Sequence, residues 1–204
     1  MKTEIIAAAI KFGAATLHEA QGRRGDLPAG IRALAPGMRL GGPAYTVRTR
    51  MGHNLLLHRA IAAAPSGSVL VAATGGPEGY EWGYWGDIMT TAAQARGIVG
   101  LIIDGCVRDR DAITKSGFPV FCRGTAIRGT EKSPDGALDV PVVLGNALVS
   151  SGDLIVADND GVVVVCKRAI DNVLGAARAR EEKEKAVLAA LRTGRTTLEL
   201  YGWS

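Results

Sequence analysis

The chain has 204 residues, of which 47% are hydrophobic and 22% charged, and its formal net charge is +4. This length fits one domain of ordinary size, and the composition provides a sizeable core and excludes a disordered chain. Only three histidines and three cysteines are present, without a CxxC pair, so a zinc cage or a disulfide scaffold is not expected and Asp, Glu, Arg and backbone amides must supply the candidate catalytic groups.

The pattern of charged and apolar residues also limits the partners. Lysine and arginine alternate with acidic residues and form no basic stripe, so we expect no nucleic-acid binding. The longest apolar runs, 98–103 and 161–166, are far shorter than the roughly 20 residues that cross a bilayer, so no membrane span is predicted. Three cysteines in or beside apolar, strand-like runs are typical of small buried side chains in a reduced, cytoplasmic protein.

The first half of the chain alternates between helical and extended patterns. Residues 2–20 carry apolar side chains at helical spacing, and residues 53–64 fit a second helix. Residues 44–50 and 68–74 are predicted strands. Residues 75–86 are rich in glycine and aromatic residues and indicate a loop.

The second half begins with a helix over 87–96, followed after Gly97 by a strand over 98–104. A helix over 108–117 and a strand over 118–124 come next. Turns then separate four short strands, and a long charged helix over 168–192 closes at Gly194; the strands are 140–144, 147–149, 153–158 and 161–166. This order predicts a mixed α/β fold with a layered sheet core, formed by one domain over residues 1–204.

The strongest candidate site lies where the helix over 87–96 meets the end of the following strand. A helix of about 15 Å and a strand of about 20 Å, joined by a tight turn, run antiparallel. The amides of residues 86–89 then lie near the turn 104–109, which contains Arg108 and Asp109. Helix amides bind anions, and carboxylates such as Asp87 and Asp109 bind a hard metal ion.

Each of these residues also has a purely structural interpretation. Asp87 is well placed to cap its helix, and Asp104 before Gly105 is typical of a turn. Arg108 and Asp109 fit a solvated first turn of the next helix. Their joint position opposite one helix N-terminus favours a site, since independent caps need not converge there.

The segment from Trp85 to Ile113, with the sequence WGDIMTTAAQARGIVGLIIDGCVRDRDAI, resembles the core signature of 4-hydroxy-4-methyl-2-oxoglutarate aldolase and the regulator of ribonuclease activity A. Further stretches agree in order, at 52–61, 118–130 and 151–165. The resemblance implies a layered β/β/α sandwich of the swivelling-domain kind, assembled as a homotrimer or homohexamer. It also implies a lyase dependent on Mg²⁺ or Mn²⁺, which cleaves 2-oxo acids to release pyruvate through a metal-stabilised enolate.

The same resemblance implies roles for individual residues. Gly86, Asp87, Ile88 and Met89 would bind the substrate carboxylate, and Arg108 would contact the substrate and stabilise the enolate. Asp109 would ligate the metal, and Asp87 would hold metal-bound water. An acid from the C-terminal helix of the next subunit would complete the site, and Glu182 and Glu184 are the candidates.

The substrates implied are 4-hydroxy-4-methyl-2-oxoglutarate, 4-carboxy-4-hydroxy-2-oxoadipate and oxaloacetate. Two positions depart from the aldolase pattern: Ala112 stands where an acid is usual, and His53 replaces the acid before Asn54. Neither departure touches Arg108 or Asp109. The alternative interpretation is a non-catalytic ring that binds and inhibits a ribonuclease, a function that has no need of Arg108 and Asp109 opposite a helix N-terminus.

Overall fold

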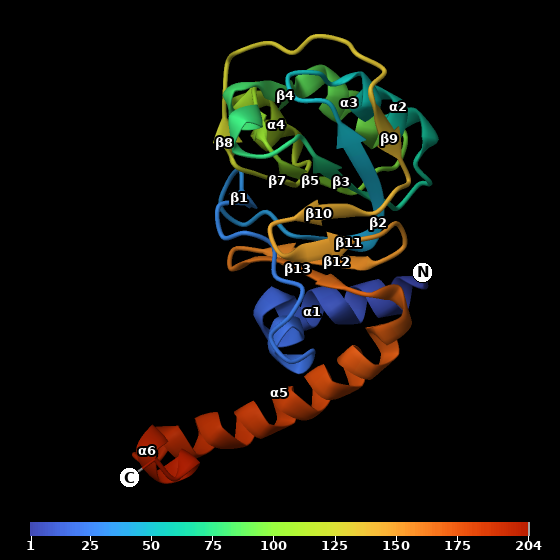
Figure 1. The fold of residues 1–204 in the computed structure, drawn as a ribbon. Coiled ribbons are helices and arrows are strands. Elements are labelled where there is room, and N and C mark those ends of the chain that lie inside the picture. The colour runs from blue at the N-terminus through green and yellow to red at the C-terminus, as the bar shows by residue number, and fades with distance from the viewer. Residues whose placement is uncertain (204) are drawn as a thin grey trace.

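The computed structural model describes residues 1–203, and its main feature is one large sheet that bends around a small hairpin, with helices packed on its outer face (Figure 1). The sheet contains eight strands in the order β1-β7-β5-β3-β2-β12-β13, with β9 also paired to β2. Strands β2, β3, β5 and β7 run parallel, whereas β12, β13, β1 and β9 pair antiparallel with their neighbours. The bounds are β1 Arg32–Ala33, β2 Leu40–Thr49, β3 Val69–Ala73, β5 Gly100–Asp104, β7 Val120–Cys122, β9 Gly136–Leu138, β12 Leu154–Asp158 and β13 Gly161–Val165.

Helices cover the parallel part of the sheet on one face, together with a small three-stranded sheet (Figure 1). These elements are α2 (Leu55–Ala63), α3 (Asp87–Ala95), α4 (Arg110–Ser116), β4 (Gly83–Trp85), β6 (Cys106–Val107) and β8 (Gly124–Thr125). On the other face lies a hairpin of β10 (Val142–Leu144) and β11 (Ala147–Val149). The mixed α/β class predicted from the sequence is confirmed.

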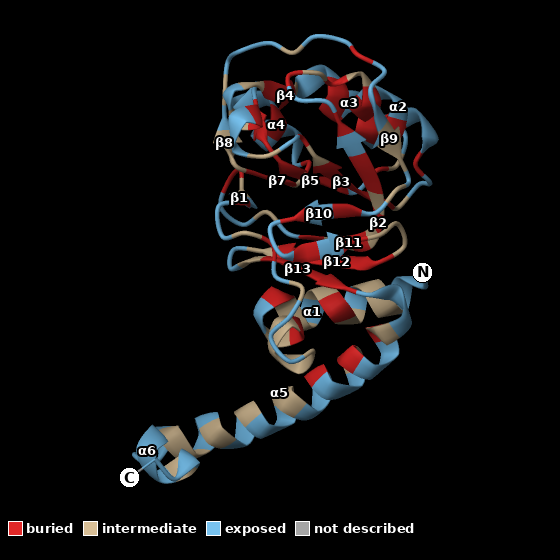
Figure 2. Ribbon diagram, viewed as in Figure 1, coloured by how far each residue is buried: buried red, intermediate tan, exposed pale blue. Residues whose placement is uncertain are grey.

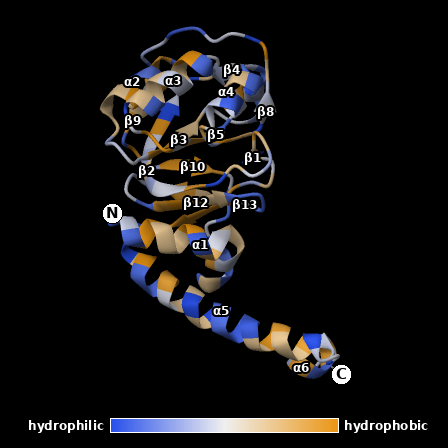
Figure 3. Cartoon of the chain, turned by 180° about the vertical axis from the view of Figure 1, so that it is seen from behind, coloured by the Kyte–Doolittle hydropathy of each residue, from blue (hydrophilic) through white to orange (hydrophobic). Residues whose placement is uncertain are grey.

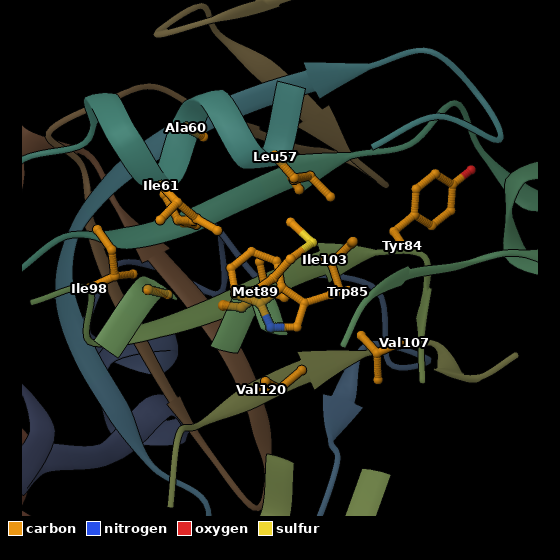
Figure 4. Packing of buried hydrophobic residues seen from close by; sticks show 14 of the residues in the cluster. Leu57, Ala60, Ile61, Tyr84, Trp85, Met89, Ile98, Ile103, Val107 and Val120 are labelled. Carbon is orange, nitrogen blue, oxygen red and sulfur yellow. The ribbon is translucent and has the colours of Figure 1, made fainter. Parts of the chain in front are cut away.

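Buried residues, red in Figure 2, form three clusters that hold these layers together. The first lies between the parallel strands and helices α2 to α4, where the ring of Trp85 stacks on Phe118 at a centroid distance of 6.1 Å. Figure 4 shows Met89 beside Trp85, below the side chains that α2 contributes. The second group lies between the sheet and the β10–β11 hairpin, and the third between β12–β13 and helices α1 and α5.

The N-terminal helix α1 (Thr3–Ala20) is bent at Gly13, which has φ 80° and ψ 167°. After this break the amide of Ala14 donates a hydrogen bond of 2.8 Å to Oδ2 of Asp158, so a side chain from β12 caps the second half of the helix. The single straight helix predicted over 2–20 is therefore two helical segments, because only glycine adopts a positive φ at this point without a steric penalty.

The long C-terminal helix α5 (Ile170–Arg192) is confirmed, preceded by a 3₁₀ turn η2 (Lys167–Ala169) and followed by α6 (Thr197–Tyr201). Its first half packs on α1, and its second half projects away from the body of the molecule (Figures 2 and 3). The sequence did not indicate α6, whose capping box joins Thr196 and Glu199.

Other sequence expectations need correction. Residues 75–86 are not a featureless loop: they form a 3₁₀ helix η1 (Pro77–Glu81) and strand β4. Cys106 and Cys122 are buried as expected, but Cys166 is exposed. Within residues 1–203 the chain forms no helix with the length and apolar character that a membrane crossing requires.

Candidate active site

The start of α3 and the end of β5 meet because the chain reverses tightly between them. At the end of α3 the amide of Ile98 donates to the carbonyl of Ala93, and Gly97 adopts φ 72°. The positive φ strains any residue with a Cβ atom, and a Cβ atom at Gly97 would also lie 2.3 Å from Oγ of Ser66, so glycine suits this turn. Strand β5 therefore returns alongside the helix, as the sequence predicted.

Two hydrogen bonds connect the α3 N-terminus with the turn after β6. The amide of Arg108 donates to the carbonyl of Trp85 over 2.8 Å, and the amide of Asp87 donates to Oδ2 of Asp109 over 3.2 Å. Nε of Arg108 lies 3.8 Å from the same carboxylate oxygen, with both side chains about half exposed. The structure thus brings Gly86, Asp87, Arg108 and Asp109 together.

Residues 86–89, at the start of α3, have differently placed side chains. Gly86 is the N-cap residue and Asp87 is the first helical residue, so Asp87 does not cap α3 with its side chain. Ile88 is 80% exposed, whereas Met89 is buried against Trp85 (Figure 4). Met89 and Ile88 can therefore contact an anion through their backbone amides, which the first turn of a helix leaves without intrahelical partners.

Asp109 has an unusual backbone conformation. Its φ of 57° and ψ of 38° place it in the left-handed region, which is uncommon for a residue with a Cβ atom but is adopted by Asp and Asn more readily than by other such residues. The Asp109 carboxylate lines the cavity and accepts a hydrogen bond from the Asp87 amide. An uncommon backbone conformation at a residue that lines a cavity is typical of a functional position.

The cavity at this point has a volume of about 230 Å³, and its lining includes residues that sequence reasoning missed. Lys132 donates from Nζ to Oδ1 of Asn54 over 2.5 Å, and Nδ2 of Asn54 donates to the carbonyl of Tyr84 over 2.8 Å. Desolvation by the surrounding protein, and secondarily the charge of Lys132, lower the pKa of His58 from its ordinary value although the residue stays partly exposed. Besides Arg108, the cavity lining therefore carries one lysine cation and, at neutral pH, an uncharged histidine.

Whether a divalent metal ion fits this position depends on the oxygen atoms available to coordinate it. Within residues 1–203 no group of three or more His, Cys, Asp or Glu side chains could enclose a metal ion. Asp109 uses Oδ2 for the Asp87 amide, and its other oxygen has no hydrogen-bond partner in that range. One or two carboxylates at an open position suit Mg²⁺, which retains water and binds substrate oxygens rather than a full protein cage. The donor set therefore fits an open magnesium-type site.

The sequence suggested that Asp104 is a turn residue, and the structure shows that it is not. It ends β5 with a largely buried side chain, and its Oδ1 accepts hydrogen bonds from Nε of Arg123 at 2.6 Å and the hydroxyl of Tyr80 at 2.8 Å. The Asp104 carboxylate is committed to this ion pair and lies outside the cavity of Arg108 and Asp109.

Glu182 and Glu184 lie on α5, which is at the opposite end of the molecule from α3 (Figure 1). Glu182 accepts a hydrogen bond from Lys185, and Glu184 pairs with Arg180 at 2.9 Å. The structure of one chain does not bring either acid to Asp109. A contribution from a neighbouring subunit stays a prediction.

The chain matches the family described as RraA-like: Aldolase/RraA over residues 8–164. It is 35% identical over 161 residues to a Halalkalibacterium halodurans protein named "Putative 4-hydroxy-4-methyl-2-oxoglutarate aldolase", covering 79% of this chain and 76% of that one. The crystal structure of an uncharacterized protein from Pseudomonas syringae pv. tomato is 32% identical with a TM-score of 0.85, covering 100% of this chain and 95% of the other.

The crystal structure of Streptomyces coelicolor RraAS2, described as an unusual member of the RNase ES inhibitor RraA protein family, is 29% identical. Its TM-score is 0.77, and the match covers 92% of this chain and 96% of the Streptomyces chain. The family match spans most of the chain, and the fold agrees with both solved structures. The chain belongs to the RraA-like family.

Proposed function

We propose that the protein is a divalent-metal-dependent lyase that releases pyruvate from 2-oxo acids with a second carboxylate, with oxaloacetate decarboxylation among its activities. The observation that carries the proposal is the convergence of the α3 amides, Arg108 and Asp109 on one cavity. These are an anion receptor, a fixed cation and a metal-binding carboxylate, which is the set that cleavage next to a 2-oxo group requires.

The substrate carboxylate binds at the start of α3. The amides of Ile88 and Met89 are free for this contact, whereas the Asp87 amide is occupied by Asp109. The positive end of the helix dipole adds to the attraction. This contact fixes the C1 end of the substrate and leaves the 2-oxo group toward Arg108.

Arg108 stabilises the charge that develops during bond cleavage. When the C3–C4 bond breaks, its electron pair stays on C3 and delocalises onto the 2-oxo oxygen. C4 leaves as CO₂ from oxaloacetate, or as the carbonyl carbon of a second 2-oxo acid from an aldol substrate, whose C4 hydroxyl gives its proton to a base. A proton from water then restores the methyl group of pyruvate. The Arg108 guanidinium lines the cavity and lies beside Asp109. Asp109, with Asp87 nearby, would hold Mg²⁺ or Mn²⁺, which supplies Lewis-acid polarisation of the 2-oxo group when bound.

Lys132 supplies a further cation for the second carboxylate. Lys132 lines the same cavity as Arg108 and is anchored by Asn54. His58 stays uncharged at neutral pH because its pKa is lowered, so Lys132 rather than His58 is the second cation of the cavity. A dicarboxylic substrate is therefore favoured over a monocarboxylic one.

The acid that completes the reaction would come from a second copy of the chain in a homotrimer or homohexamer. Glu182 and Glu184 are the candidates because the second half of α5 extends beyond the body of its own subunit (Figure 1). Within one chain both acids are paired with basic neighbours on the same helix, Lys185 and Arg180.

The test is a coupled assay for pyruvate. Oxaloacetate and 4-hydroxy-4-methyl-2-oxoglutarate are supplied separately with Mg²⁺ or Mn²⁺, and pyruvate is measured with lactate dehydrogenase against a protein-free control, because divalent metals alone decarboxylate oxaloacetate. We expect enzymatic pyruvate release with metal and none above control with EDTA. Absence of pyruvate from both substrates would overturn the proposal.

Gly86→Ala offers a sharper test of the geometry. A Cβ atom at residue 86 would lie 2.3 Å from Oδ2 of Asp109, so this carboxylate has to move away from the α3 amide. The backbone of Gly86 is extended, with φ −150°, and alanine adopts it without strain. Since misplacement by about 1 Å can cost about a hundredfold in rate, we expect a loss of that order in pyruvate release.

The measurement pairs this assay with urea unfolding, in which Gly86→Ala should retain nearly the stability of the parent. Gly175→Ala is a matched control, because a Cβ atom there meets no other atom within 4 Å. Full activity in Gly86→Ala would show that the position of Asp109 is unimportant.

A second candidate function, inhibition of a ribonuclease, is favoured by the likeness to Streptomyces coelicolor RraAS2. It predicts a stable complex with an RNase E-type enzyme and no pyruvate release. Gel filtration with such a ribonuclease, set beside the pyruvate assay, separates the two functions.

A further inference from the structure

A second and larger cavity, of about 810 Å³, lies away from the cavity of Arg108 and Asp109. It is formed where β2, β3 and β5 end, with wall residues Thr49, Ala73 and Asp104. The two cavities share no lining residue. The carboxyl ends of neighbouring parallel strands are where open α/β sheets bind ligands.

Three arginines and a single carboxylate line this second cavity, namely Arg48, Arg50, Arg123 and Asp104. Asp104 is neutralised, because its Oδ1 accepts from both Arg123 and Tyr80. The hydroxyl of Tyr80 stays protonated as a donor, since burial and the bond to Asp104 raise its pKa to about 12. The negative charge of Asp104 is therefore compensated by Arg123 and does not offset the positive charges of Arg48 and Arg50.

Those two arginines differ in their partners. Arg50 pairs with Asp135, which does not line the cavity, at 2.9 Å, and both side chains are 60% exposed. Arg48 is exposed at the end of β2, and within residues 1–203 its guanidinium has neither an ion pair nor a side-chain hydrogen bond. Arg48 thus presents a planar double donor to the cavity, the geometry that binds a carboxylate through two parallel bonds.

The rest of the wall is apolar. Met51, Pro77, Pro141, Val142 and Val143 line it, and Val143 is 60% exposed. Inorganic anions gain nothing from such a surface, whereas a ligand with a hydrocarbon body buries apolar area there. A ligand that fits both parts of the lining therefore has a negatively charged group for the arginines and an apolar body for the rest of the wall.

We infer that this cavity is a binding site for a small organic carboxylate with an apolar body, held by Arg48 and packed against Val142 and Val143. The site is separate from the proposed reaction centre, and occupancy requires neither metal nor turnover. It therefore stands independently of the proposed lyase activity.

Benzoate is a suitable probe, because it has one carboxylate and a flat apolar body and lacks the 2-oxo group of the substrates. Calorimetric titration of the full chain in EDTA should give saturable binding with one site per chain. Arg48→Gln should weaken it by about tenfold or more, the usual effect of losing a charge-assisted hydrogen bond. Arg108→Gln and Arg59→Gln should leave the affinity unchanged, the latter as a matched loss of an exposed arginine on α2.

Two further ligands separate the contributions. Benzamide, which keeps the ring and lacks the charge, should bind much more weakly if Arg48 holds a carboxylate. Inorganic phosphate should also bind weakly if the apolar wall contributes. The inference is overturned if benzoate does not saturate, if Arg108→Gln abolishes binding while Arg48→Gln retains it, or if phosphate binds as tightly as benzoate.

Discussion

Asp109→Asn should reduce metal-dependent pyruvate release by about a thousandfold or more, while the protein remains folded. The substitution removes the negative charge that would bind the metal ion and keeps the size of the side chain. Asparagine also tolerates the left-handed conformation found at this residue, with φ 57°. The loss therefore reports the charge of the side chain rather than a change in the backbone. It is measured as kcat/KM for pyruvate release over a range of Mg²⁺ and Mn²⁺ concentrations.

Asp111→Asn is the matched control, because Asp111 is exposed in the first turn of α4, two residues along the chain. We expect it to retain activity close to that of the parent. Asp109→Ala should lose activity similarly and additionally lose about 1 kcal/mol of stability through the left-handed backbone. Metal-dependent turnover by Asp109→Asn near the parent rate would contradict a role for this carboxylate in metal binding.

Arg123→Gln should lower the free energy of unfolding by about 3 kcal/mol, because it leaves Asp104 as a buried charge without its cation. The two side chains are only 18% and 11% exposed, so solvent screens their interaction little. The guanidinium also lies over the Tyr80 ring, 4.9 Å from its centroid, and this contact is lost as well. Urea unfolding measures the effect, and Asp104→Asn combined with Arg123→Gln should recover part of the loss since no unpaired charge remains.

Arg50→Gln is the control, because it removes an ion pair that is exposed to solvent rather than buried. Its pair with Asp135 has a similar N–O distance, 2.9 Å, but both side chains are 60% exposed, so its removal should cost less than about 1 kcal/mol. Equal losses for Arg50→Gln and Arg123→Gln would mean that burial does not determine the contribution of these pairs.

The part of the site formed by local chain reversal could be predicted from the sequence. Gly97 between a helical pattern and an apolar strand indicates a tight turn, and the structure accordingly places the start of α3 beside Arg108 and Asp109. The helix and strand lengths alone are enough for this result, because the two elements are adjacent in the chain.

Contacts between distant parts of the chain could not be predicted. Lys132 reaches the site from the segment before β9 and Asn54 from the start of α2, and no spacing in the sequence relates the two residues. The pair of Asp104 and Arg123 likewise depends on the parallel pairing of β5 and β7, whereas the dipeptide Asp104-Gly105 alone favours a turn. Strand β4 was also not predicted, because its segment is rich in glycine and aromatic residues and so resembles a loop. The structure shows that its three residues are buried.

The pairing of β2 has a consequence for folding as the chain leaves the ribosome. Residues 44–48 of β2 pair with β3, which is synthesised shortly afterwards, but residues 40–43 pair with β12, which is made only after the whole α2-to-β11 region. An edge with unsatisfied backbone groups therefore persists through most of synthesis, and such edges promote association with other nascent chains. Translation that pauses before Leu154 should expose this edge for longer and increase aggregation.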